Sequence, residues 1–66
     1  MNVIVNGEER EVQEEATINC LLAELDLLNR PVLVEYNGTA LFPRDFKGTK
    51  LKSEDRIELI RVVAGG

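Results

Sequence analysis

The chain ends in Gly65 and Gly66, and the reactive group that they present is the α-carboxylate of Gly66. A terminal carboxyl group has a pKa of about 3.3–3.7, so at pH 7 it is ionised and can attack an activated phosphate without a base from this chain. Glycine has no Cβ, which lets such a tail enter a channel too narrow for larger side chains. Fully extended, a tail of residues 64–66 would reach about 10 Å beyond a folded domain. We therefore expect Gly66 to react inside another protein, with Gly65 supplying slender reach.

Few other residues could carry chemistry. The chain has no histidine and one cysteine, Cys20, which excludes a Cys–His pair and an intramolecular disulfide. Cys20 lies beside the apolar face of a predicted helix, where we expect a small hydrophobic residue at the margin of the core or partly exposed. The acidic residues of the first segment lack calcium-loop spacing, which favours a solvated edge over a metal site; they are Glu8, Glu9, Glu11, Glu14 and Glu15.

Size and charge narrow the possible functions. A chain of 66 residues with a net charge of −4 predicts one small domain without room for a deep catalytic cleft. The acidic balance disfavours nucleic acid and suits a protein partner with a basic docking face. The sequence shows neither a signal-peptide pattern nor an apolar run of the roughly 20 residues that a membrane span needs. We expect a cytoplasmic protein that is not an enzyme by itself and binds neither a metal nor a cofactor.

Turn signals and apolar spacing predict the elements that must position the tail. Asn-Gly pairs at 6–7 and 37–38 favour type I′ hairpin turns. Ile18, Leu21 and Leu22 begin an apolar helical face that Leu25 continues, with Thr17 as the N-cap. The helix is expected to end near Asn29-Arg30-Pro31, because proline cannot continue it. The remaining expectations are strands at 1–5, 8–13, 32–36, 39–41 and 57–63, a loop with about one helical turn at 42–48, and a turn at 53–55.

These elements predict an α+β fold. One helix packed across a mixed sheet of four or five strands covers the apolar face of that sheet economically. With the first and last strands paired in the centre, the arrangement is a ubiquitin-like β-grasp. We expect a β-grasp domain at residues 1–63 and a flexible Gly-Gly tail at residues 64–66.

The last predicted strand offers a surface for partners. Alternation places Ile57 and Leu59 on one face and Ile60 and Val62 on the other. If the first pair joins the core, the second pair is exposed on the strand that leads into the tail, which favours docking over ordinary surface exposure. The facing of Leu33 is ambiguous. Two further candidates, Arg44 and Arg61, are either polar contacts at the rim of this surface or solvated charges.

Several short segments, weak alone, combine into a strong pattern through their order and spacing: Asn6-Gly7, Ala16-Thr17-Ile18 before Leu21-Leu22, Val34 to Asn37-Gly38, Pro43-Arg44, Leu51-Lys52 through Asp55-Arg56-Ile57-Glu58, and Gly65-Gly66. In these segments and in total length the chain resembles the thiamine-biosynthesis sulfur carrier family, a bacterial branch of ubiquitin-like proteins. Asn19 and Cys20 match no motif of that family, and Tyr36 stands where a small aliphatic residue is common.

The resemblance implies a function as a modified protein cosubstrate. A partner adenylyltransferase, similar to ubiquitin-activating enzymes, would use ATP-Mg to convert the Gly66 carboxylate to an acyl-adenylate. Sulfur from a donor such as a cysteine desulfurase would displace AMP and leave a thiocarboxylate, which thiazole synthase would consume. Two alternatives share the fold and tail: the small subunit of molybdopterin synthase and another sulfur carrier. An alternative of a different class is a β-grasp interaction domain whose tail is never activated.

Overall fold

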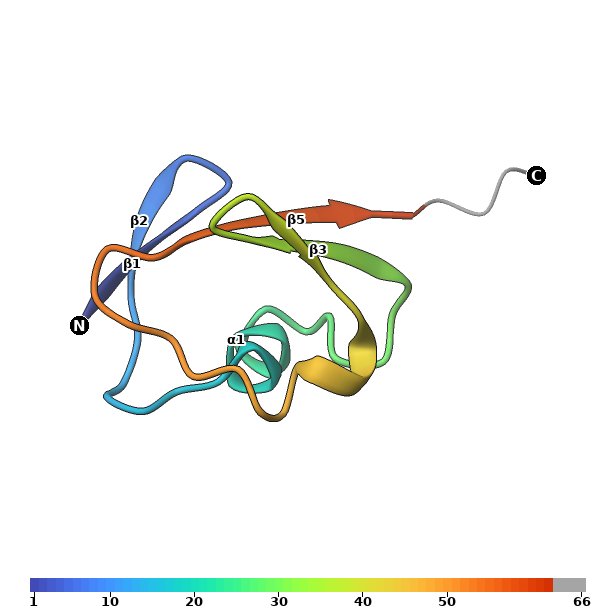
Figure 1. Cartoon of the computed structure of the whole chain (residues 1–66), viewed down its shortest axis with the longest axis horizontal. Helices are drawn as coiled ribbons and strands as arrows, with labels where there is room; N and C mark the ends of the chain where they lie inside the picture. The colour runs from blue at the N-terminus through green and yellow to red at the C-terminus, as the bar shows by residue number, and fades with distance from the viewer. Residues whose placement is uncertain (63–66) are drawn as a thin grey trace.

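The computed structural model describes residues 1–62 as a five-stranded sheet with one α-helix beneath it (Figure 1). The sheet has the strand order β2-β1-β5-β3-β4, in which β1 and β5 are parallel and the other neighbours are antiparallel. The predicted β-grasp, with its first and last strands paired in the centre, is confirmed. The elements are β1 (Asn2–Val5), β2 (Glu8–Glu11), α1 (Ile18–Glu24), β3 (Val32–Tyr36), β4 (Thr39–Leu41), the 3₁₀ turn η1 (Pro43–Asp45) and β5 (Arg56–Arg61).

Both Asn-Gly pairs form the predicted hairpin turns. The φ angles are 50° at Asn6 and 83° at Gly7, and 49° at Asn37 and 87° at Gly38. Positive φ at both central residues is the requirement of a type I′ turn, whose twist matches that of the flanking strands. The first turn joins β1 to β2 at the sheet edge, and the second joins β3 to β4 at the opposite edge.

The core lies between the sheet and α1. Apolar residues at alternate strand positions meet the apolar face of the helix, and burying each large side chain contributes roughly 1.5–3 kcal/mol. The fully buried side chains of Ile18, Leu21 and Leu22 come from α1. Opposite them, the sheet and loops contribute buried residues that include Val3, Val34, Leu51, Ile57 and Leu59.

The helix is shorter than predicted. It begins as expected at Thr17, whose hydroxyl oxygen accepts a hydrogen bond from the Cys20 N–H. It ends at Glu24 instead of near residue 29, because Asp26 takes a left-handed φ of 59°. The N–H groups of Leu27 and Asp26 then donate to the carbonyls of Leu22 and Ala23, at 2.8 and 3.1 Å, which is a Schellman C-cap.

Three strands also differ from their predicted bounds. β1 begins at Asn2 instead of residue 1, and β2 ends at Glu11 instead of 13. β5 covers Arg56–Arg61 where 57–63 was predicted, and residue 63 lies outside the described residues. Residues 63–66 fall outside the described part of the chain. The predicted tail at 64–66 and its boundary with the domain therefore lie outside the described residues. Within residues 1–62, no helix is long and apolar enough to cross a membrane.

A buried carboxylate fixes the turn that precedes β5. Asp55 is 8% exposed and accepts hydrogen bonds from the Tyr36 hydroxyl at 2.5 Å, the Lys52 backbone N–H at 2.7 Å and the Asn37 side-chain amide at 3.1 Å. The donors are the last residue of β3, the first residue of the β3–β4 turn and the loop before β5. The network therefore ties the start of β5 to the β3–β4 hairpin.

Candidate docking surface

The central strand β5 leads toward the C-terminus, and its pairing with neighbouring strands differs along its length. Its first half pairs with β1, since the Ile4 N–H donates to the Asp55 carbonyl at 2.8 Å and the Asn6 N–H to the Ile57 carbonyl at 2.9 Å. Its antiparallel pairing with β3 continues to Arg61. The predicted reactive residue Gly66 and the tail residue Gly65 lie outside the described residues. The candidate site is therefore the surface of β5 and of the strands beside it.

The faces of β5 are as predicted. Ile57 and Leu59 are buried against the helix, at 0% and 8% exposure. Ile60 and Val62 are exposed on the side of the sheet that faces away from α1. Two apolar side chains thus face outward at the end of the strand that precedes the tail.

Neighbouring strands enlarge this apolar surface. Leu33 pairs directly with Ile60 across the β3–β5 ladder, which resolves its facing, and it is exposed. Phe42 follows β4 in an extended conformation; Leu41 pairs with the buried Val34, so alternation turns Phe42 outward at the level of Leu33. We name the set Leu33, Phe42, Ile60 and Val62 the outer patch. It contains four of the five exposed large hydrophobic residues among residues 1–62, which is a concentration typical of a protein interface.

An acidic pair adjoins the outer patch. Glu35 lies directly opposite Glu58 in the same ladder, and both side chains are exposed on the outer face. Like charges placed opposite each other destabilise a sheet slightly, so a cation from a partner would relieve their repulsion. The outer face therefore combines an apolar surface near the end of β5 with negative charge beside it. This arrangement suits a partner whose docking face is apolar with a basic margin.

The two arginines predicted as candidates for the rim of the docking surface lie on different sides of the sheet. The guanidinium carbon of Arg44 lies 4.9 Å from the centre of the Phe42 ring, a cation–π contact that places Arg44 at the rim of the outer patch. Arg61 pairs with Val32 and alternates with Ile60, so its side chain lies on the helix-facing side of the sheet. The structure thus brings Arg44, but not Arg61, to the outer patch.

Cys20 is exposed, in agreement with its predicted place at the margin of the core. The Thr17 hydroxyl donates a hydrogen bond to its sulfur at 3.3 Å, and this bond is the largest of the influences that lower the pKa of the thiol. The cysteine is on α1 and is separated from the outer patch by the sheet. Within the described residues, no group of three or more metal-ligating side chains comes together.

Sequence reasoning missed two features of this surface. One is Phe42, because the sequence predicts a loop at 42–48 and does not reveal the register of β4 against β3 that turns Phe42 outward. The Glu35–Glu58 pair depends on the register of β3 against β5, which joins residues far apart in the sequence.

Comparisons with known proteins agree with this geometry. A family model described as "ThiS family" matches residues 3–66. A crystal structure of the thiamine biosynthesis protein (ThiS) from Geobacter metallireducens superposes with a TM-score of 0.84 at 33% identity, covering 100% of both chains. An uncharacterized protein (ycf40) of Porphyra purpurea is 32% identical over 66 residues, which are 100% of this chain and 93% of that protein. A thiazole synthase of Paramagnetospirillum magneticum is 30% identical over the whole chain, which spans only 20% of that longer protein.

Proposed function

Because this chain belongs to the ThiS family, we propose that it is a sulfur carrier of thiamine biosynthesis whose Gly66 carboxylate is activated and converted to a thiocarboxylate by partner enzymes. The observation that carries the proposal is the outer patch, which includes Ile60 of β5 and Val62 just after it and so offers partners an apolar surface on the part of the chain that leads toward Gly65-Gly66. The catalytic groups of the reaction belong to those partners.

The chemistry follows from the carboxylate. Oxide is a poor leaving group, so sulfur cannot replace a carboxylate oxygen directly. An adenylyltransferase with ATP-Mg joins a Gly66 oxygen to the α-phosphate of ATP and releases pyrophosphate. A persulfide sulfur, from a donor such as a cysteine desulfurase, attacks the carbonyl carbon and expels AMP. Reductive cleavage of the resulting acyl disulfide by a thiol leaves the thiocarboxylate on Gly66.

The thiocarboxylate then supplies sulfur to thiazole synthase. Support for this acceptor comes from the thiazole synthase of Paramagnetospirillum magneticum, in which a region similar to the whole of this chain occurs in the same polypeptide. Of the relatives described above, the Geobacter metallireducens protein is named for thiamine biosynthesis and the Paramagnetospirillum magneticum protein for thiazole synthesis. They favour this pathway over the small subunit of molybdopterin synthase.

Intact-mass spectrometry tests the proposal. The chain is incubated with the adenylyltransferase, ATP-Mg and a persulfide donor, and its mass is compared with that of a sample without ATP. The expected product carries one sulfur in place of one oxygen, located at Gly66 by fragmentation. A chain that gains neither AMP nor sulfur would refute the carrier function and leave an interaction domain without tail activation.

A further inference from the structure

The β1-facing edge of β5 is unpaired at its C-terminal end. In the antiparallel ladder with β3, the Val62 N–H donates to the Pro31 carbonyl and the Asn37 N–H to the Arg56 carbonyl, so the even-numbered residues of β5 point their backbone groups toward β3. The odd-numbered residues point theirs toward β1. β1 pairs with β5 only as far as Ile57, and the next donor, the Leu59 N–H, is taken by the Asn6 side-chain oxygen at 2.7 Å.

Beyond that bond, the edge of β5 is open. Within residues 1–62, no group accepts from the Arg61 N–H, and no N–H reaches the Leu59 carbonyl. Asn6 ends β1 with its left-handed turn, so the chain leaves β5 at this point instead of continuing beside it. Unpaired backbone groups on a strand edge are a template for another extended segment.

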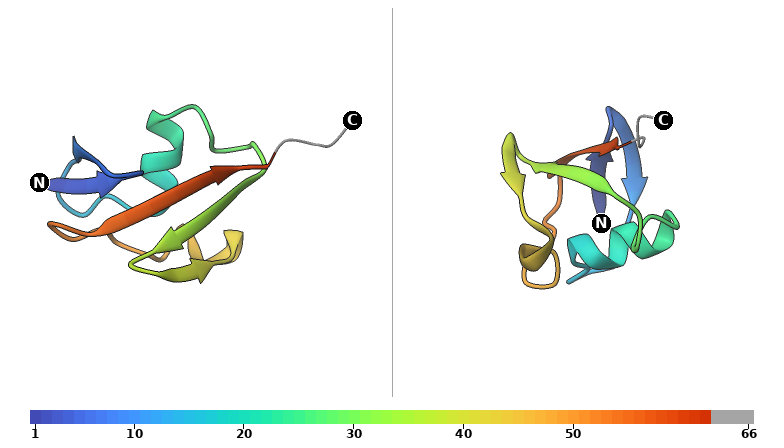
Figure 2. Two further views of the ribbon diagram at one scale, coloured as in Figure 1. Left: turned by 90° about the horizontal axis from the view of Figure 1, so that it is seen from above. Right: turned by 90° about the vertical axis from the view of Figure 1, so that its right-hand side faces the viewer.

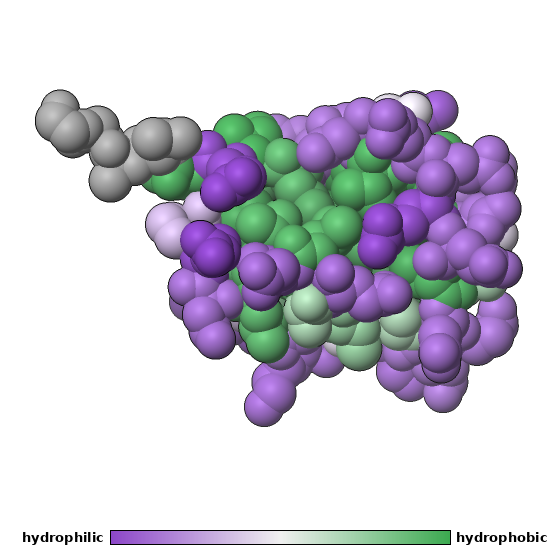
Figure 3. All heavy atoms as spheres, turned by 180° about the vertical axis from the view of Figure 1, so that it is seen from behind, coloured by the Kyte–Doolittle hydropathy of each residue, from purple (hydrophilic) through white to green (hydrophobic). Residues whose placement is uncertain are grey.

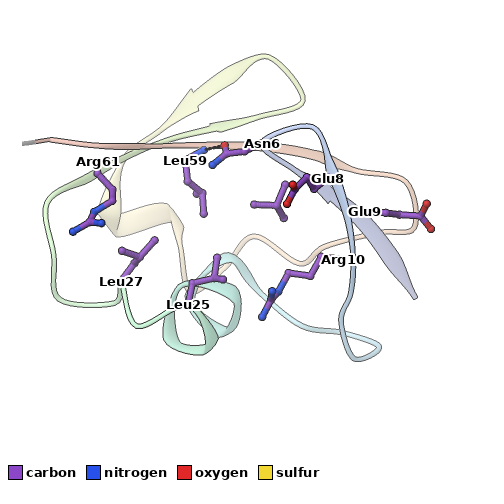
Figure 4. A pocket seen from close by; sticks show the side chains of 9 residues that line it. Asn6, Glu8, Glu9, Arg10, Leu25, Leu27, Leu59 and Arg61 are labelled. Carbon is purple, nitrogen blue, oxygen red and sulfur yellow. Dashed lines mark hydrogen bonds between the residues drawn. The ribbon is translucent and has the colours of Figure 1, made fainter.

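The open edge borders a cleft of about 380 Å³ between the sheet and the end of α1 (Figure 4). Its apolar lining consists of Val5, Leu25, Leu27 and Leu59. Seen from behind, the molecule shows an apolar surface, green in Figure 3, that is framed by hydrophilic residues. The cleft is on the helix side of the sheet, so it is separate from the outer patch.

The charges of the cleft indicate what would enter it. Arg10 and Arg61 line it from β2 and β5, and Figure 4 shows both side chains directed toward the space below the sheet. Neither forms an ion pair with another of the described residues, and the Nε atom of Arg10 is buried without a hydrogen-bond partner there. Glu8 contributes one carboxylate to the cleft, and Glu9 points away from it (Figure 4). With two guanidinium groups and one carboxylate, the cleft has a net positive charge. The cleft is therefore complementary to an apolar side chain accompanied by a carboxylate.

We propose that this cleft binds an extended segment of the enzyme that activates Gly66, which adds to the sheet as a strand beside Leu59–Arg61. Alternate side chains of an added strand point to the same face, so an apolar residue and an acidic residue two positions apart would meet Leu25 and Leu27 and the two arginines. Main-chain pairing at Arg61 would fix the register of the partner segment relative to β5. Five residues lead from Arg61 to Gly66, and five fully extended residues span about 16–18 Å, so the bound segment would lie within that distance of the reacting carboxylate. The inference rests on the proposed function for the identity of the partner.

Amide hydrogen exchange tests the added strand without any substitution. The ¹⁵N-labelled full chain is exchanged alone and with excess adenylyltransferase, then quenched, and protection is read from the NMR spectrum of the released chain. The Arg61 N–H is expected to exchange rapidly in the free chain and at least about tenfold more slowly in the mixture. The Ile60 N–H, which faces β3, serves as the internal control because it is protected in both. An unchanged Arg61 exchange rate, with binding demonstrated at the outer patch, overturns the proposal.

Matched variants test the cleft itself. Leu27→Glu places a charge in the cleft, whereas Leu28→Glu makes the same change at the next residue, outside it. We expect Leu27→Glu to raise the KM of adenylation at least about tenfold and Leu28→Glu to leave it within about twofold. Equal KM values for the two variants, both shown to be folded, would overturn the proposal.

The experiments distinguish failure of the carrier function from failure of the added strand. If the carrier function is wrong, the wild-type chain gains neither AMP nor sulfur. The exchange measurement needs no turnover, so it reports on the added strand whether or not Gly66 reacts. Protection of the Arg61 N–H by thiazole synthase or by a second copy of the chain, and not by the adenylyltransferase, would also overturn the proposal as stated.

Discussion

Leu33 lies directly opposite Ile60 in the ladder between β3 and β5, and both side chains stay exposed, at 58% and 49%. The strands that carry them, β3 from the middle of the chain and β5 near its C-terminal end, lie side by side in the sheet (Figure 2). Since the pair lies opposite the core-facing side of the sheet, it contributes little to folding. Its chemistry is suited to contact with a partner.

Replacing Ile60 with glutamate is expected to weaken docking without unfolding the protein. The carboxylate would be desolvated at the centre of the interface and would lie near Glu58, so we expect a loss of about 2 kcal/mol in binding, or about 30-fold in affinity. The folded state should lose less than about 1 kcal/mol, the range of strand-surface substitutions. Titration calorimetry with the adenylyltransferase measures the first quantity and urea unfolding the second.

Leu28→Glu is the control for this prediction, because Leu28 is also exposed but lies on the connection between α1 and β3. It should bind the adenylyltransferase like the wild type. If the Ile60→Glu variant binds the adenylyltransferase as tightly as the wild type does, the outer patch is not part of the interface. An unfolded variant would contradict the outward facing of Ile60.

Deleting Gly66 is expected to abolish sulfur transfer and to preserve the fold. The shortened chain still ends in a carboxylate, but that group is displaced by about 3.5 Å along an extended tail. A misplacement of about 1 Å can already cost a factor of 10² in rate, so activation should fall below detection. Intact mass after incubation with the partner enzymes reports the transfer, and the thermal midpoint reports the fold. Sulfur incorporation by the shortened chain would argue against Gly66 as the reacting residue.

Most of the fold could be predicted because its signals are local. The two Asn-Gly turns and the spacing of Ile18, Leu21 and Leu22 are visible in short windows of sequence, and the burial of Ile57 and Leu59 follows from strand alternation. The early end of the helix was missed, because the prediction relied on Pro31 as the stop signal. The left-handed Asp26 that ends the helix five residues earlier is visible only in the backbone geometry.

The candidate site was predicted less completely, because it depends on pairing between distant segments. Ile60 and Val62 could be identified from alternation within one strand. The same alternation separates Arg61 from Ile60, so grouping those two on one surface was the weaker inference. The cleft beside Arg61 was not visible in the sequence at all, since it exists only because β1 ends before β5 does.

The Asn6 side chain is expected to stabilise the end of the β1–β5 pairing. Its oxygen accepts the Leu59 N–H at 2.7 Å, while its backbone holds a φ of 50°. Asn6→Asp keeps the acceptor and tolerates the turn, whereas Asn6→Gly keeps the turn and removes the acceptor. We expect the glycine variant to be about 1–2 kcal/mol less stable than the aspartate variant, since a partly buried N–H is left unsatisfied. Urea unfolding measures the difference, and equal stability of the two variants would mean that the bond contributes nothing.

The Tyr36–Asp55 hydrogen bond makes stability depend on pH in two opposite directions. Burial, then the hydrogen bond to Asp55 and its charge, raise the pKa of Tyr36 to about 12. Burial also raises the pKa of Asp55, but hydrogen bonds from Tyr36, the Lys52 amide and Asn37 outweigh it, so that this pKa lies below its ordinary value of 3.8. The stability linked to Asp55 is therefore present above pH 3.8 and is lost as pH falls through the lower, folded-state pKa. The stability linked to Tyr36 is present below pH 10 and is lost as pH rises through about 12.

Removing the hydroxyl with Tyr36→Phe should lower the free energy of unfolding by about 1.5–3 kcal/mol near neutral pH, the usual contribution of a hydrogen bond to a charged group. The difference between wild type and variant should narrow in acid, where protonation of Asp55 weakens the bond, and again in alkali, where the unfolded wild type ionises its tyrosine first. Tyr36 is the only tyrosine and the chain has no tryptophan, so phenolate absorbance reads its titration directly. A difference in stability that stays constant from acid to alkali, or a phenol that titrates at 10, the ordinary value for tyrosine, would contradict the coupling of Tyr36 to Asp55.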